Sequence, residues 1–101
     1  MNIQEIQTGN FSSIKGSWRN AQGNSITFDA NGLIQVNSRP AGDVVFDKFV
    51  VQGEKLTAVT KTSEGISETP IVFTPRGQDG RESIFWSKNH VSDGTDIYYR
   101  E

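Results

Sequence analysis

The residues best suited to chemistry in this chain surround its single histidine, His90, whose neighbours include Ser87, Ser92, Asp93 and Asp96. A hydrolytic triad needs a nucleophile, a histidine base within hydrogen-bond reach and a third group that orients the base. Neither serine lies in the strand-to-helix turn pattern that exposes a nucleophile. We therefore predict that His90 is not catalytic and that the chain is not an enzyme.

The acidic side chains are a second candidate for chemistry. Six aspartates fall in stretches that favour turns, namely Asp29, Asp43, Asp47, Asp79, Asp93 and Asp96. Aspartate is common in turns because its carboxylate bonds the nearby backbone. A paired-carboxylate glycosidase site needs a sugar-sized cleft, for which 101 residues leave little room. With one histidine and no cysteine, we expect no metal site and no cofactor.

Aromatic residues near the end of the chain offer a third kind of site. Trp86, Tyr98 and Tyr99, with Phe85 beside them, lie in stretches of strand character. Neighbours on a strand point to opposite faces, so some of these rings must face outward. Exposed aromatic rings can mark a binding face. We expect Trp86, Tyr98 and Tyr99 to contact a ligand or partner, with a purely structural role as the alternative.

Charge and hydropathy exclude several classes of partner. The chain has 10 basic and 12 acidic side chains and no basic run, so we expect no nucleic-acid partner. No apolar run reaches the roughly 20 residues of a membrane span, and residues 1–15 lack the apolar segment of a signal peptide. We expect a monomer with no membrane-spanning segment within this chain.

The elements that would position these residues begin with a short helical turn. Phe11 and Ile14 share one face of that turn, and Gly16 ends it because glycine adopts the left-handed backbone without strain. Trp18 then enters the first strand as the predicted core anchor. Ahead of the turn, residues 1–9 are too short for a stable isolated helix. We expect them to form a solvated arm or one docked turn, followed by a single domain over residues 10–101.

From Gly16 onward, alternating polar and apolar residues between glycine turns predict about eight short strands. Asn31-Gly32 is typical of a tight type I′ hairpin, which would direct Ile34 and Val36 of the returning strand inward. Asp47-Lys48 interrupts the most apolar run and predicts a bulge.

Short links between strands favour an all-β antiparallel meander. Pairing of the first strand with the last would remove exposed edges, so we predict a closed or nearly closed small barrel. The alternative is an open β-sandwich, in which Trp18 and Arg100 would not touch.

Two resemblances add to this interpretation. Gly16-Ser17-Trp18, after a helical turn, resembles the lipocalin and avidin barrels, in which a basic residue of the last strand often covers the tryptophan. The resemblance implies that Gly16, Trp18 and Arg100 form a structural anchor. The longer run from Phe11 to Phe28 is similar to an uncharacterised small β-domain of surface lipoproteins in Gram-positive bacteria. That likeness implies an extracytoplasmic module at the cell surface, which meets a membrane only through a lipid anchor outside this chain. It supplies no catalytic or binding residues.

Two functions follow as expectations. The first is a non-catalytic binding or interaction module of a bacterial surface lipoprotein, with another protein, a wall polymer or a small ligand as its partner. The second is a lipocalin-like binder that holds a small ligand inside its barrel. An apolar cavity of ~300 Å³ or more inside the barrel would favour the second function.

Overall fold

A computed structural model describes residues 1–42, 44–61, 68–77, 80–86 and 97–100 of the chain. The chain forms one helix, one 3₁₀ turn and nine strands over these residues. In order they are α1 (Ile3–Gln7), η1 (Ser12–Ile14), β1 (Gly16–Arg19), β2 (Ser25–Asp29), β3 (Gly32–Val36), β4 (Arg39–Pro40), β5 (Val45–Gln52), β6 (Lys55–Lys61), β7 (Glu68–Thr74), β8 (Ser83–Trp86) and β9 (Ile97–Arg100).

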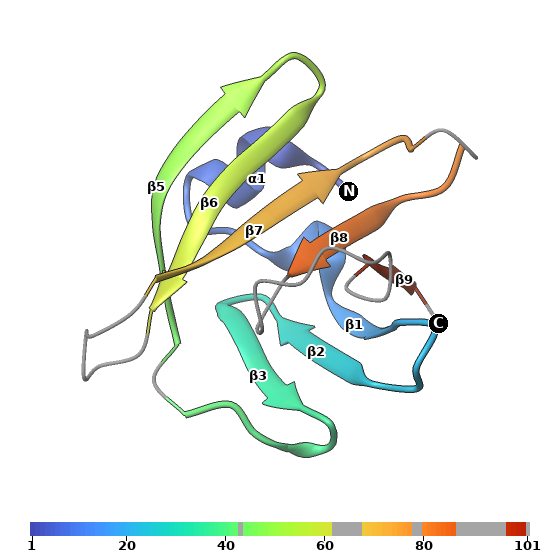
Figure 1. Ribbon diagram of the computed structural model, residues 1–101. Coiled ribbons are helices and arrows are strands. Elements are labelled where there is room, and N and C mark those ends of the chain that lie inside the picture. Colours follow the sequence, from blue (N-terminus) through green and yellow to red (C-terminus); the bar gives the residue numbers. More distant parts are fainter. Residues whose placement is uncertain (43, 62–67, 78–79, 87–96, 101) are drawn as a thin grey trace.

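All strands belong to one antiparallel sheet, which curls into a half-barrel (Figure 1). The order across the sheet is β4-β3-β2-β1-β9-β8-β7-β6-β5. The prediction of an all-β antiparallel meander is therefore confirmed, and the alternative of two packed sheets is wrong. As predicted, the first strand pairs with the last: Trp18 lies opposite Arg100 in the ladder between β1 and β9.

The opening of the half-barrel lies between β4 and β5, two strands that follow each other in the chain but form opposite edges of the sheet. β4 has only two residues, and one of them is Pro40, which has no backbone N–H to donate to a further strand. Across this opening the contact is made by side chains. The ring of Phe46 on β5 lies 4.9 Å from that of Phe11 and 6.4 Å from that of Phe28.

The concave side of the sheet holds the core. Its largest fully buried side chains are Trp18, Phe28, Phe73, Ile6, Ile14, Ile26, Leu56, Ile71 and Ile84. Ile26 and Phe28 on β2 share one face of their strand, and so do Ile84 and Trp86 on β8, as alternation predicts. In both strands this shared face is the buried one. Buried polar groups are paired, since the indole N–H of Trp86 donates to the Thr60 hydroxyl at 2.9 Å.

The N-terminal residues are not a solvated arm. The side chain of Asn2 caps α1 by accepting hydrogen bonds from the backbone N–H groups of Gln4 and Glu5 at 3.1 Å each. The helix contacts β6, and Ile6 is completely buried in the core. Tertiary packing stabilises a helix of five residues that would be marginal alone. The docked turn, the second expectation for residues 1–9, is the one observed.

Two details of the β2–β3 hairpin differ from the prediction. The carboxylate of Asp29 accepts from the backbone N–H groups of Asn31 (2.8 Å) and Gly32 (3.0 Å), which builds an aspartate-capped turn in place of type I′. A bulge then places Leu33 opposite Phe28, so Leu33 is buried and Ile34 is exposed. The prediction that Ile34 points inward is wrong because one bulged residue reverses the alternation.

Positive φ at two successive residues occurs one turn later, between β3 and β4. Asn37 (φ 53°) and Ser38 (φ 64°) connect Val36 to Arg39. This pair of angles is the type I′ pattern expected at Asn31-Gly32. The predicted bulge in β5 is present, since the β5–β6 register shifts between Asp47 and Val50 and Lys48 has φ of 57°.

Candidate functional site

Gly16, Trp18 and Arg100 meet where the first and last strands pair. The guanidinium of Arg100 lies 4.5 Å from the centre of the Trp18 ring, and the indole N–H of Trp18 donates to the carbonyl oxygen of Ile14 at 2.9 Å. Arg100 also donates to the carbonyl oxygens of Ser13 (2.8 Å) and Lys15 (3.3 Å). These carbonyls belong to η1 and its end, and Gly16 follows with φ of 120°. The arrangement joins the helical turn, β1 and β9 around the fully buried Trp18, which indicates a structural role.

Glu82 completes this cluster from the segment before β8. Its carboxylate accepts from Nε of Arg100 at 3.0 Å and also pairs with the amino group of Met1. Partial burial opposes ionisation of Glu82, but the hydrogen bonds and positive charges of the amino group and Arg100 outweigh it. The pKa of Glu82 therefore lies below its ordinary value.

The aromatic residues expected to contact a partner divide between the two faces of the sheet. Trp86 and Tyr98 are 5% and 6% exposed and belong to the core, so the expectation of a contact surface is wrong for both. Tyr99 is half-buried on the opposite, convex face. Successive side chains of a strand point to opposite faces of the sheet, which explains this division. Tyr98 shares the inward face with Ile84, its cross-strand partner, and Tyr99 must then point outward.

The candidates for catalysis divide into those that the structure describes and those that it does not. His90, Ser87, Ser92, Asp93 and Asp96 lie outside the described residues, as do Asp43 and Asp79. Among the residues that are described, no group of three or more histidine, cysteine or acidic side chains could hold a metal ion.

Two of these aspartates, Asp29 and Asp47, lie in the described part of the chain, and the carboxylate of each accepts hydrogen bonds from nearby groups. Asp29 caps its turn, as described above. The carboxylate of Asp47 accepts from the backbone N–H of Lys48 (2.9 Å) and from the Lys61 amino group (3.2 Å), and both hydrogen bonds lower the pKa of Asp47. Turn and bulge chemistry therefore accounts for these two carboxylates.

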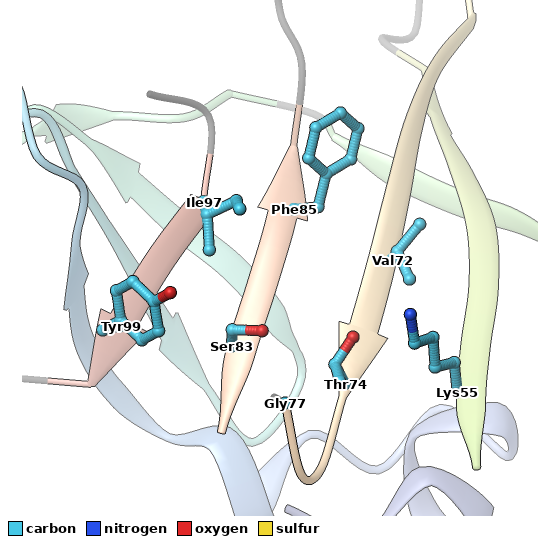
Figure 2. Close-up of a pocket in the computed structure, with 8 residues that line it drawn as sticks. All are labelled: Lys55, Val72, Thr74, Gly77, Ser83, Phe85, Ile97 and Tyr99. Carbon is cyan, nitrogen blue, oxygen red and sulfur yellow. The ribbon is translucent and has the colours of Figure 1, made fainter. Parts of the chain in front are cut away.

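A groove of about 500 Å³ lies on the convex face of β6, β7, β8 and β9 (Figure 2). Its lining residues are Lys55, Val72, Thr74, Gly77, Ser83, Phe85, Ile97 and Tyr99. They come from strands that are far apart in sequence, and the antiparallel register places them side by side. Of the aromatic residues singled out from the sequence, Tyr99 and Phe85 line this groove.

Two cross-strand rows form the floor of the groove, and they differ in polarity. Val72, Phe85 and Ile97 stand opposite one another in an apolar row. One pair further along each strand, Thr74 faces Ser83 and Ser83 faces Tyr99 in a row of hydroxyl-bearing side chains. The Lys55 side chain extends beside Val72 and Thr74 at the β6 side (Figure 2). The groove can therefore hold a ligand that is apolar along one side and polar along the other.

A second hollow of about 470 Å³ lies at the β3–β4 turn and is lined by Val36, Asn37, Arg39, Pro40 and Ala41. The lining is local to one turn, and Arg39 and Pro40 are both exposed. Its side chains do not converge from several elements, so the groove on β6–β9 is the stronger candidate site.

Sequence reasoning missed most of the groove. Outward positions of β7, β8 and β9 could be read from alternation, but their alignment into rows depends on the register between strands, which alternation within one strand does not specify. Lys55 follows the tight turn at Gly53, which has φ of 62°, and its sequence context contains nothing that singles it out from the other lysines.

The fold and this groove define a class: a small all-β half-barrel with a filled concave side and a grooved convex side. Residues 1–100 match the model of a protein family, and the chain belongs to that family, the domain of unknown function DUF6287. No curated protein and no solved structure matches the chain. Over the residues that the structure describes, no helix is long and apolar enough to cross a membrane.

Proposed function

We propose that this chain is a non-catalytic binding module that works outside the cytoplasm, at the surface of a Gram-positive bacterium, and that it binds through the groove on β6–β9. The single observation that carries the binding role is that groove. It is an open, amphipathic site, whereas the side chains under the same strands are packed into the core. The proposed location rests on the similarity of the run from Phe11 to Phe28 to a domain of surface lipoproteins.

The second expected function, a small ligand inside the barrel, has less support. The concave side of the sheet contains Trp18, Phe28 and Phe73, each at most 1% exposed. The rings of Phe28 and Phe73 pack edge to face, with centres 6.5 Å apart. A ligand there would have to displace core side chains, while the convex groove accepts one without rearrangement.

A binding experiment with cell-wall material tests the proposed function. Purified sacculi with attached wall polymers, and separately a set of secreted bacterial proteins, are incubated with the chain and with Phe85→Asp, which puts a charge in the centre of the groove. Ile34→Asp serves as the matched control, because Ile34 is 42% exposed on β3 and lies outside the groove. We expect retention of the original chain and of Ile34→Asp, and at least tenfold weaker retention of Phe85→Asp.

Equal retention of the two variants would refute binding through the groove. The proposed location has its own test: the native full-length protein on intact cells should be cleaved by added protease while a cytoplasmic marker stays intact. Protection of the protein equal to that of the marker would refute the extracytoplasmic assignment.

A further inference from the structure

The two rows of the groove place an apolar surface next to a positive charge. The apolar row continues past Val72 through Thr57 to Val50 on the edge strand β5, and the Thr57 hydroxyl donates to the backbone oxygen of Val50 at 3.2 Å. Bonding of this hydroxyl to the backbone leaves the row without a free polar group between Phe85 and Val50. The convex face therefore carries a continuous apolar strip across five strands, from Ile97 on β9 to Val50 on β5, and hydroxyl-bearing side chains lie beside it.

Lys55 differs from the other lysines of the β5–β6 hairpin in having no counter-ion within the described part of the chain. The amino group of Lys48 binds the Glu68 carboxylate at 3.0 Å, and that of Lys61 binds Asp47 at 3.2 Å. Among the described residues, the groove lining contains no carboxylate. A positive charge beside an apolar surface, without an acidic group in that described lining, favours an anion as the ligand group that it contacts.

Tyr99 argues against a neutral sugar stacked on the groove. The guanidinium of Arg81 lies 4.1 Å from the centre of the Tyr99 ring and covers one face of it. On the apolar row, Phe85 stands between two branched aliphatic side chains, Val72 and Ile97, which suit a hydrocarbon better than a flat sugar ring.

We infer that the groove binds an anionic amphiphile: a molecule with a carboxylate or phosphate that pairs with Lys55 and a hydrocarbon part that lies on Val72, Phe85 and Ile97. This inference rests on the proposed function, because it assigns a ligand class to the same groove. The hydroxyl groups of Thr74 and Ser83 line the same groove as Lys55 and can donate hydrogen bonds to the anion. The sign of the ligand's charge and its apolar part are thus both specified.

Titration with simple amphiphiles tests the inference. Octanoate, octyl phosphate, octylammonium and octyl glucoside, all below their micelle concentrations, are added to isotope-labelled chain, and amide shifts are followed by NMR. We expect one or both anions to shift amides of β6–β9 and to bind at least tenfold more tightly than octylammonium or octyl glucoside. Octanoate alone would identify a carboxylate ligand, and octyl phosphate alone a phosphate.

Variants locate the two halves of the site. Lys55→Gln should weaken the anions about tenfold and remove their advantage over octyl glucoside. Val72→Thr and Phe85→Ser should weaken every ligand, and the isosteric Val72→Thr remains informative if Phe85→Ser fails to fold. Lys15→Gln is the matched control, since Lys15 is exposed and lies outside the groove, and it should change nothing.

Three results would overturn the inference: equal binding of anionic and cationic amphiphiles, unchanged anion affinity in Lys55→Gln, or shifts confined to other elements. Absence of anion binding, with sacculus or protein binding still lost in Phe85→Asp, would reject the ligand class and leave the proposed function standing. Absence of both would reject both.

Discussion

The two faces of β6–β9 are built by the same strands and behave in opposite ways. On the concave side Leu56, Phe73, Ile84 and Tyr98 stand opposite one another, and none is more than 6% exposed. One residue away along each strand, the convex row contains Thr57, Val72, Phe85 and Ile97, all half-buried. Both rows are mainly apolar, so hydrophobicity alone does not separate core from site.

Curvature separates them. The concave side of a curled sheet brings side chains from distant strands together. The contacts of Phe28 on β2 with Phe46 on β5 and Phe73 on β7, at 6.4 and 6.5 Å between ring centres, show this. The convex side spreads its side chains apart, so an apolar row there stays partly open. A small half-barrel therefore has its interior filled by its own aromatic residues, and its convex face is the place where apolar groups remain available to a ligand.

The largest expected effect comes from truncating one ring on each face. Phe73→Ala should lower the free energy of unfolding by about 3–5 kcal/mol, because it leaves a cavity among fully buried side chains. Phe85→Ala, on the convex row, should lower it by no more than about 2 kcal/mol, because its ring is already partly hydrated. Urea unfolding followed by tryptophan fluorescence measures both. Equal losses would mean that the ring of Phe85 contributes to stability as much as a core side chain does, and that the convex row is part of the core.

Sequence patterns anticipated the concave side well. Alternation put Ile26 with Phe28, and Ile84 with Trp86, on one face of their strands, and these faces are buried. The pairing of β1 with β9 was predicted from the short links between strands and the residues at the two ends of the chain. These features depend on the alternation of side chains along each strand and on the short links between strands, and both can be read directly from a sequence.

Two of the errors arise because a single residue can reverse the inward–outward alternation of a strand or change the type of a turn, and two arise from long-range packing. A bulge opposite β2 turned Ile34 outward, and capping by Asp29 replaced the expected turn at Asn31-Gly32. Docking of Ile6 depends on a space in the core that only the assembled sheet creates. The groove depends on the mutual register of β6 to β9, a long-range property that no local stretch of sequence specifies.

A second, smaller effect should come from the buried polar pair of the concave side. The Thr60 hydroxyl accepts from the Trp86 indole and donates to the backbone oxygen of Thr69 at 3.0 Å. Thr60→Val keeps the shape but leaves a buried N–H without this acceptor, so unfolding free energy should fall by about 1–3 kcal/mol. Thr60→Ser keeps the hydroxyl and should lose well under half as much. If Thr60→Val left the free energy of unfolding unchanged, water would have to reach the Trp86 indole N–H on the concave side. The difference in hydration between the two faces would then be smaller than the burial indicates.

The smallest effect concerns Glu82, which pairs with Arg100 and so helps to hold β9, a strand with side chains on both faces of the sheet. Because the pKa of Glu82 in the folded state lies below its ordinary value of 4.5, ionised Glu82 stabilises the fold above that pH, and this contribution is lost as pH falls through the lowered pKa. Glu82→Gln should therefore remove a few tenths to about 1 kcal/mol at pH 7 and flatten the acid limb of the stability profile. Glu68→Gln is the control, since Glu68 pairs with an exposed lysine on the β5–β6 side of the sheet. Urea unfolding between pH 2.5 and 7 measures the profile, and an unchanged acid limb in Glu82→Gln would show that Arg100 holds β9 through Trp18 and the carbonyls of η1 alone.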